Sequence, residues 1–446
     1  MRLRGAALAA CLLAALTAGR LRCEARPNIL LLSVDTLRAD RLSSYGYSRG
    51  TSPNIDRLLD RGVRFAEART VEPLTAPALA SMLTSLHPHE HGSTRNGLRV
   101  RTDLLSLPKI LRRQGYHTAA FVGSWTLQEK LWGMAGHFER FAEVLNRARW
   151  FGMVRREATA EDLNQAAIDW LDQQLTSRER RPFFLWLHYV EPHAPYRLHR
   201  SFLDQLGADP GGELYSASGR YDTEIAYVDH QISRLLDAVS ERVDAEVLTI
   251  FVADHGESLG EHGYWGHGRH VYEATLWIPM GIVWPERLAP RVIEAPSLII
   301  DLAPTILGLL ELPIPEFFQG FDWAPVLSLG ADPPVDRESY YQSHRGATSA
   351  KEDLSRSRQK GLLEVARLEG WHKEIFRVTN GRRRMFDVRS DRAEEEGLVE
   401  LRSEVSEDLG RWLEAVRHGL ALADELPPPS LSDEDLERLR ALGYID

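Results

Sequence analysis

The stretch NILLLSVD, residues Asn28–Asp35, has the pattern of a strand that is buried on both faces. It is a short, almost continuous apolar run that ends abruptly at an acidic residue. A strand with one wet face would alternate apolar and polar residues instead. Similar runs occur at His117–Val122, Pro182–Leu187 and Val247–Ala253. The sequence therefore predicts a buried, mostly parallel sheet.

Helical patterns lie between these runs, at residues 54–62, 162–175 and 222–239. Alternating strands and helices predict an α/β fold, with a doubly wound central sheet flanked by helices. A proline-rich stretch, residues 313–334, marks the end of this region. We expect one large domain at residues 26–330.

The segment 331–446 has a different pattern, which predicts a small subdomain. Short strands are expected at residues 362–368, 374–379 and 384–388, around the turn Asn380-Gly381. Helices are expected at residues 406–421 and 433–442. The pattern is that of a small C-terminal antiparallel sheet followed by a helical tail.

The first 25 residues resemble a secretory signal, with arginines before an apolar stretch from Gly5 to Gly19. Cleavage after Ala18 or Ala25, an uncleaved anchor near a membrane, and lipid attachment at Cys11 are the alternatives, of which the last is the weakest. We expect an exported protein that is periplasmic, extracellular or membrane-anchored. The only other cysteine, Cys23, also lies in this leader, so a chain cut after Ala25 has no thiol chemistry.

Composition limits the possible partners. The chain has 446 residues, of which 43% are hydrophobic, enough for a large core. Its formal charge is -10, and its lysines and arginines are scattered among acids. No basic footprint for nucleic acid is visible, so we expect no nucleic-acid partner.

Polar residues follow two of the predicted strands, where an α/β sheet binds its ligands. Asp35 ends the first strand, and Asp254 and His255 follow the fourth. Carboxylates together with an imidazole form the mixed oxygen and nitrogen set that divalent cations bind in proteins. We expect these residues to lie together and to hold a metal ion.

Thr75 begins the segment TAPALASMLT, which predicts a helix from this residue to Ser85. In one interpretation Thr75 is an ordinary helix N-cap. In the other, the free N–H groups and positive end of the helix bind an anionic ester, and the hydroxyl is a nucleophile. A metal at Asp35 and Asp254 would activate that hydroxyl, so Thr75 is also a candidate ligand.

Five histidines cluster after strand ends or among glycines, namely His188, His193, His262, His267 and His270. Each alone fits an ordinary surface or core histidine. Together they are candidates for lining a pocket as proton donors, phosphate-binding groups or ligands of a second metal.

Several segments resemble the sulfatase branch of the alkaline-phosphatase superfamily, in order over residues 26–325. They are residues 27–35, 52–58, 62–65, 81–84, 88–92, 192–196, 254–263, 272–273 and 278–279. The resemblance implies the superfamily's α/β fold, a bound metal and hydrolysis of an anionic ester of a glycan, a lipid headgroup or a small molecule.

The sequence departs from the sulfatase pattern at the places that would bind and attack a sulfate. Sulfatases carry Cys or Ser in a Cys/Ser-x-Pro-x-Arg motif that is oxidised to formylglycine, whereas this chain has Thr75 and Leu79. Thr36 stands where the family has a second Asp, and Ser124 and Thr126 stand where it has Lys and His. Formylglycine chemistry is therefore not expected.

The remaining set, Asp35, Thr75, Asp254 and His255, resembles that of threonine-nucleophile relatives, namely phosphodiesterases and transferases of phosphoglycerol or phosphoethanolamine. It implies one divalent ion, Mn²⁺, Zn²⁺ or Ca²⁺. A second ion is left open, with Glu191, His193 and His267 as its candidate ligands.

Three functions follow from these residues. In the first, Thr75 attacks a phosphate ester while His193 and His267 assist the leaving group. In the second, the chain hydrolyses sulfate esters without formylglycine. In the third, it is catalytically silent and binds an anionic glycan or lipid headgroup.

Overall fold

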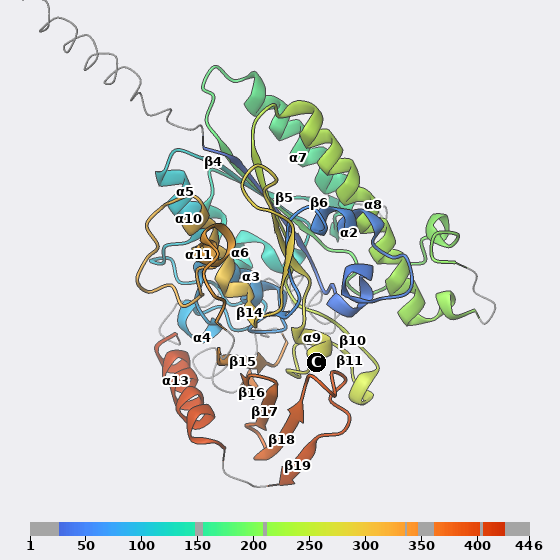
Figure 1. The fold of residues 1–446 in the computed structure, drawn as a ribbon, viewed down its shortest axis with the longest axis vertical. Coiled ribbons are helices and arrows are strands. Elements are labelled where there is room, and N and C mark those ends of the chain that lie inside the picture. Colours follow the sequence, from blue (N-terminus) through green and yellow to red (C-terminus); the bar gives the residue numbers. More distant parts are fainter. Residues whose placement is uncertain are drawn as a thin grey trace, which may run out of the picture.

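An eight-stranded mixed sheet lies at the centre of the computed structural model (Figure 1). The structure describes residues 26–147, 155–207, 212–334, 337–346, 361–401 and 405–423, so the predicted leader and the predicted helix 433–442 lie outside the described residues. In sheet order the strands are β13 (Arg291–Ile293), β2 (Val63–Phe65), β12 (Met280–Val283), β9 (Val247–Ala253), β1 (Asn28–Val34), β8 (Phe183–Tyr189), β4 (His117–Val122) and β5 (Arg140–Glu143).

The central strands agree with the sequence prediction. β1 pairs in parallel with β8 on one side and with β9 on the other, and all seven of its residues are buried. β12 is the exception to the parallel pattern, because it pairs antiparallel with both β9 and β2. The α/β fold with a mostly parallel sheet is therefore confirmed.

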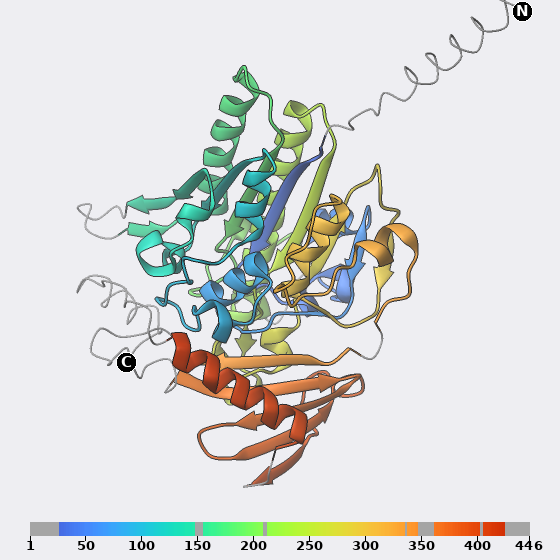
Figure 2. The ribbon, with the colours of Figure 1, turned by 90° about the vertical axis from the view of Figure 1, so that its left-hand side faces the viewer.

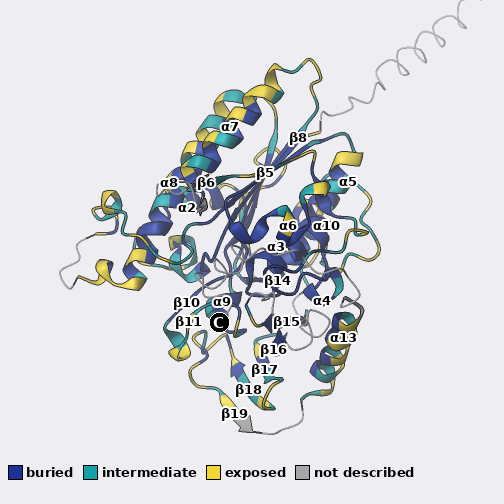
Figure 3. Ribbon diagram, turned by 180° about the vertical axis from the view of Figure 1, so that it is seen from behind, coloured by how far each residue is buried: buried dark blue, intermediate teal, exposed yellow. Residues whose placement is uncertain are grey.

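Helices cover both faces of this sheet, as Figures 1 and 3 show. One layer contains α2 (Pro53–Leu59), α7 (Ala160–Thr176) and α8 (Ala217–Arg242), whose outer sides are exposed. The other contains α3 (Thr75–Thr84), α5 (Leu107–Arg113), α10 (Leu302–Leu309) and α11 (Ala324–Leu329). The short helices are α4 (Pro88–His91), α6 (Glu129–Trp132) and α9 (Glu273–Leu276).

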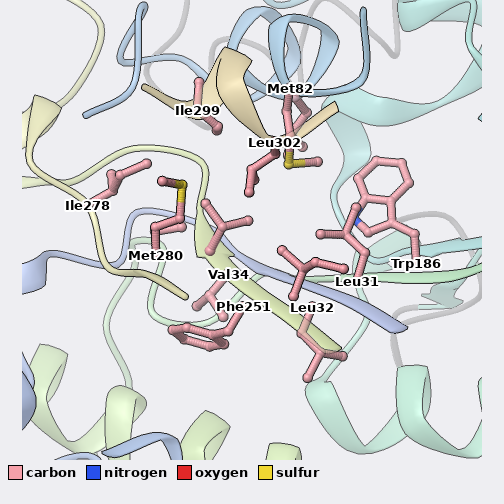
Figure 4. Packing of buried hydrophobic residues seen from close by; sticks show 14 of the residues in the cluster. Leu31, Leu32, Val34, Met82, Trp186, Phe251, Ile278, Met280, Ile299 and Leu302 are labelled. Atoms are coloured by element: carbon pink, nitrogen blue, oxygen red, sulfur yellow. The ribbon is translucent and has the colours of Figure 1, made fainter. Parts of the chain in front are cut away.

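Apolar side chains from the sheet and from α3 form the main core. Figure 4 shows Leu31 and Val34 of β1 in the same cluster as Met82 of α3 and Leu302 of α10. α3 is buried along its whole length. This burial fixes the helix relative to the end of β1, which matters for the site below.

A second, antiparallel sheet of five strands forms the C-terminal part of the structure (Figure 2). Its strands are, in order, β15 (Ser339–His344), β16 (Leu362–Glu369), β17 (His372–Arg377), β18 (Arg382–Asp387) and β19 (Leu398–Leu401). Val365 packs with Leu409 and Leu413 of α13 (Glu407–Ala423), so this helix covers one face of the sheet. The predicted C-terminal antiparallel sheet with a helix is confirmed.

Three two-stranded ribbons complete the secondary structure. They are β3 (Ala68–Arg69) with β14 (Ser297–Leu298), β10 (Ser258–Leu259) with β11 (Trp265–Gly266), and β6 (Leu145–Arg147) with β7 (Arg155–Glu157). Among the described helices, none combines the length and the apolar character that a membrane crossing requires.

The carboxylate of Glu364 joins the C-terminal sheet to the loop that follows β11. Glu364 lies on β16 and is buried, and it accepts hydrogen bonds from His270 (3.1 Å) and from the backbone N–H of Val271 (3.2 Å). Arg377 and Arg384 also donate to the same carboxylate. Burial alone would raise the pKa of Glu364, but the hydrogen bond from His270 and the charge of Arg384 lower it to about 2.

We predict that Glu364→Gln lowers the free energy of unfolding by about 3–5 kcal/mol at pH 7, because it leaves two guanidinium groups without their counter-charge. The carboxyl pKa is lower in the folded protein than its ordinary value of 4.5, so the carboxylate stabilises the fold above that pH. As the pH falls from 4.5 toward 2, this contribution is lost. Denaturant unfolding of both proteins at several pH values should show the difference between them shrinking toward low pH.

Candidate active site

Three neighbouring parallel strands bring polar residues together at one edge of the central sheet. Asp35 follows β1, and Asp254 follows β9, at paired positions because Val34 is paired with Ala253. His188 lies in β8, where it is paired with Ser33. The predicted convergence of Asp35 and Asp254 follows from this register.

Asp35, His188 and Asp254 form a buried group that could hold a metal ion. One ligand atom from each lies within 4.8 Å of the others, and all three side chains are buried. The sequence placed His188 only among the histidines of a pocket, and its membership of the metal group was missed. Its position near the end of a buried strand, like that of Asp35, was the available signal.

The surroundings of the Asp35 and Asp254 carboxylates favour a bound cation between them. Oδ1 of Asp254 accepts hydrogen bonds from the backbone N–H groups of Thr36 (3.1 Å) and His255 (2.7 Å). Within the described residues its other oxygen, Oδ2, is buried without a hydrogen-bond partner. Burial and then repulsion from Asp35 raise the pKa of Asp254 well above its ordinary value. A divalent cation would offset both effects.

Thr36 has φ = +54°, a left-handed backbone conformation that is uncommon for a β-branched residue. This conformation directs its N–H toward Asp254. The hydroxyl of Tyr221 donates to the Thr36 carbonyl (2.7 Å) and so holds the turn. Strain of this kind is concentrated at functional sites.

Two histidines direct their Nε2 atoms toward the carboxylates, and for His255 the partner of Nδ1 fixes which nitrogen carries the proton. Nδ1 of His255 lies 2.8 Å from the carbonyl oxygen of Gly256, which can only accept, so Nδ1 carries the proton. Its Nε2 lies 3.6 Å from Asp254 and 3.7 Å from Asp35. Nδ1 of His188 lies 2.9 Å from Oγ of Ser33, and its Nε2 lies 3.8 Å from Asp35. Neutral imidazoles held in this way are typical metal ligands.

Thr75 is the first residue of α3, and its hydroxyl points into the site. Its Oγ1 lies 3.4 Å from Nε2 of His255. The N-cap position is occupied by Leu74, whose apolar side chain makes no capping hydrogen bond, so the interpretation of Thr75 as an N-cap is wrong. The structure thus brings together all four predicted residues, Asp35, Thr75, Asp254 and His255.

Asn96 lies at the same helix end and was missed by the sequence analysis. Its Oδ1 accepts a hydrogen bond from the N–H of Ala76 (3.1 Å), the residue after Thr75. Its Nδ2 is buried and has no hydrogen-bond partner among the described residues. A lone Asn in a loop gives no sequence signal for such a position.

His193 and His267 lie beside His255. The ring centroids of His267 and His255 are 4.5 Å apart, and those of His267 and His193 are 5.2 Å apart. Nδ1 of His267 donates to the buried carboxylate of Glu257 (3.0 Å), which orients the ring. The two predicted catalytic histidines therefore lie in one cluster of side chains with His255.

A family model described as "Sulfatase" matches residues 27–312, which is more than half of the chain. The chain belongs to the sulfatase family. A second model, the C-terminal part of N-sulphoglucosamine sulphohydrolase, matches residues 260–407 and includes most of the C-terminal sheet. The chain is thus a sulfatase-family ester hydrolase of the alkaline-phosphatase superfamily.

Relatives of this sulfatase-family chain are distant. The uncharacterized sulfatase YidJ of Escherichia coli (strain K12) is 24% identical over 66% of this chain and 70% of its own length. Two solved structures share the fold. One, in complex with its substrate D-glucosamine-2-N,6-O-disulfate, has a TM-score of 0.67 and 19% identity over 91% of this chain and 100% of its own. The phosphonate monoester hydrolase of Silicibacter pomeroyi has a TM-score of 0.64 and 21% identity over 88% and 95%.

The residues that depart from the sulfatase pattern are also at the site's edge of the sheet. Ser124 and Thr126 follow β4, the neighbour of β8, and both are buried. Their hydroxyls hydrogen-bond to each other at 2.9 Å. Leu79 is fully buried within α3. None of these three side chains offers the positive charge of the family's Lys, His and Arg.

The other predicted candidates have different surroundings. Glu191 accepts a hydrogen bond from the N–H of Ala160 at the start of α7 (3.3 Å), and burial raises its pKa to about 8. It is not part of the Asp35 group. His262 stacks on Tyr272, and His270 bonds to Glu364, so both contact the region of the C-terminal sheet. The structure does not bring Glu191 together with His193 and His267 as a second metal group.

The loop carrying His267 packs directly against the residue before Thr75. Gly268 has φ = +83°, and a Cβ there would lie 2.7 Å from Cδ2 of Leu74. Only glycine combines this backbone conformation with so close an approach. Gly268 thereby allows the loop that carries His267 to approach Leu74, the residue before Thr75, this closely.

We predict that Gly268→Ala reduces kcat by at least tenfold, because Leu74, and with it Thr75, must move. The control is Gly263→Ala, in the same loop. Gly263 also has a positive φ, +70°, but a Cβ there would meet nothing within 4 Å. This control should lose only about 1 kcal/mol of stability and keep its activity. Equal loss of activity in both variants would show that backbone strain alone, not the contact with Leu74, is responsible.

Proposed function

We propose that this sulfatase-family protein hydrolyses or transfers phosphate esters, with Thr75 as the nucleophile. The position of the Thr75 hydroxyl is the observation that carries this proposal. It lies at the start of a buried helix and 3.4 Å from Nε2 of His255, beside two buried carboxylates. The positive end of a helix suits the anionic ester that such a hydroxyl would attack.

The proposal includes one divalent metal ion. Asp35, Asp254 and His188 would hold it as a buried group, and Nε2 of His255, which lies 3.7 Å from Asp35 and 3.6 Å from Asp254, would complete the set. This donor set favours Zn²⁺ or Mn²⁺ over Ca²⁺, which takes oxygen ligands. When bound, the ion lowers the pKa of a neighbouring hydroxyl and neutralises charge on the ester oxygens.

The residues of the chain have separate parts in the proposed reaction. Thr75 Oγ1, after its proton passes to water, attacks phosphorus, and the positive end of the α3 dipole lies beside the ester oxygens. His267, oriented by Glu257, protonates the leaving-group oxygen. His193 stands beside it and stabilises the charge there. Water or an acceptor alcohol then displaces the threonine oxygen from phosphorus.

Phosphate esters are preferred over sulfate esters because of the side chains that surround the site. Ser124, Thr126 and Leu79 replace three charged or basic groups of the sulfatase pattern, and threonine lacks the aldehyde hydrate that expels sulfate. A phosphodiester depends more on a metal and histidines at its equatorial oxygens and leaving group.

We predict that Asp254→Asn loses both the tightly bound metal and turnover, because one carboxylate fewer leaves the cation site weakly charged. The exposed Asp60→Asn is the matched control. Metal content per chain after dialysis, measured by mass spectrometry, and ester hydrolysis should fall together in the first variant only. Full activity of the wild type in excess chelator would contradict the metal-dependent mechanism.

We predict higher kcat/KM for aryl phosphodiesters than for aryl sulfates with the same leaving group, at equal pH and saturating metal. Thr75→Ala should remove turnover of both, whereas Thr75→Ser should keep measurable activity because it retains the hydroxyl. The absorbance of the released nitrophenol is the readout for both esters. If the wild type hydrolysed the sulfate tenfold faster and the alanine variant did not, the chain would be a sulfatase that works without formylglycine.

A further inference from the structure

An excess of arginine surrounds the loop that carries His267, although the chain as a whole has a formal charge of -10. Arg269 is two residues beyond His267 and is exposed. Arg377 and Arg382 lie at the tip of the β17–β18 hairpin, where Arg377 is half-buried and Arg382 is exposed. These three side chains are named the cationic rim below.

Two contacts connect the cationic rim to the site. The guanidinium of Arg269 lies 6.0 Å from the ring centroid of Tyr264, whose hydroxyl donates to the His267 carbonyl (2.5 Å). Two residues of chain span at most about 7 Å, so the Cα atoms of His267 and Arg269 are no farther apart than this. Figure 1 shows β10 and β11, which precede this loop in the chain, beside the C-terminal sheet.

Arg377, at the tip of the β17–β18 hairpin, contacts the same loop. Nη1 of Arg377 lies 3.4 Å from the carbonyl oxygen of Arg269 and 3.4 Å from Nδ1 of His270. Arg377 and Arg382 are paired directly across the β17–β18 ladder, so their side chains leave the same face of the sheet. That face also carries Glu364, which is paired with Arg377.

The positive charge here is not balanced by the described acidic side chains. Glu364 is shared by Arg377, Arg384 and His270, so one carboxylate serves two guanidinium groups. For Arg269 and Arg382, the described part of the chain provides no ion pair. Two like charges directly opposite each other destabilise an antiparallel pair, and a bound anion would reverse that effect.

We propose that the cationic rim binds a second anionic group of the substrate, a carboxylate, sulfate or phosphate on the part of the molecule that does not react. This inference rests on the proposed function for the position of the reacting ester, and it adds the substrate class: an ester with at least one further negative charge. Guanidinium groups are suited to it because they bind oxyanions through paired N–H donors.

The test uses two 4-nitrophenyl phosphodiesters that share one disaccharide arm. In one the arm is neutral, and in the other its terminal sugar is oxidised to the uronic acid. The variant is Arg269→Gln/Arg382→Gln, which leaves Arg377 and Glu364 in place. The control is Arg61→Gln/Arg180→Gln. These arginines are also exposed, but they precede β2 and β8 and so lie at the opposite edge of the central sheet.

We expect the rim variant to raise KM for the uronate ester about fivefold at low salt, with kcat and the neutral ester unchanged, since an exposed ion pair contributes up to about 1 kcal/mol. The control should change neither ester. At 0.5 M NaCl the effect should vanish because exposed charges are screened. Equal KM changes for the two esters, or an equal change in the control, would overturn the proposal.

Binding in the Thr75→Ala background separates this inference from the proposed function. Calorimetric Kd values for the two esters need no turnover, so the uronate preference should persist there and should be lost on adding the rim substitutions. If the wild type hydrolyses neither ester but this binding preference is present, only the proposed function fails. If the wild type hydrolyses both esters and no preference is seen, only the rim proposal fails.

Discussion

The closeness of two buried carboxylates is the constraint on which the rest of the structure depends. Asp35 and Asp254 follow adjacent parallel strands, and the burial of both strands leaves no water to separate their charges. Such a pair is unfavourable unless hydrogen bonds and a cation offset it. The strained turn at Thr36, the fixed tautomer of His255 and the buried start of α3 all lie around this pair of carboxylates.

Much of the fold could be predicted because the central strands are locally unambiguous. β1, β4 and β9 have the predicted bounds, since each is a short apolar run bounded by polar residues. The antiparallel direction of β12 could not be predicted, because a strand buried on both faces has the same composition in either direction. β15, with its polar sequence SYYQSH, gives no apolar run at all and owes its place to pairing with β16.

The sequence predicted the site residues that follow strands. It did not predict those that contact residues in other segments of the chain. Asp35, Asp254 and His255 were found because strand ends converge in an α/β sheet. Asn96 and Glu257 were not found. Asn96 accepts a hydrogen bond from Ala76, and Glu257 accepts one from His267, so each role depends on a contact with another segment of the chain. Thr75 was identified as a nucleophile candidate, but its alternative as an N-cap could be rejected only from the helix geometry.

The position of β1 at the middle of the sheet also has a consequence for how the chain folds. β1 is made before either of its neighbours, and the hydrogen bond from Thr36 to Asp254 joins residues 218 positions apart. Such a high contact order makes closure of the sheet slow, because a long loop must be ordered before its contacts stabilise it. Until β8 and β9 are synthesised, the most apolar strand has both edges open to pairing with other chains. A nascent chain of this topology is therefore exposed to aggregation through these open strand edges until β8 and β9 have been made.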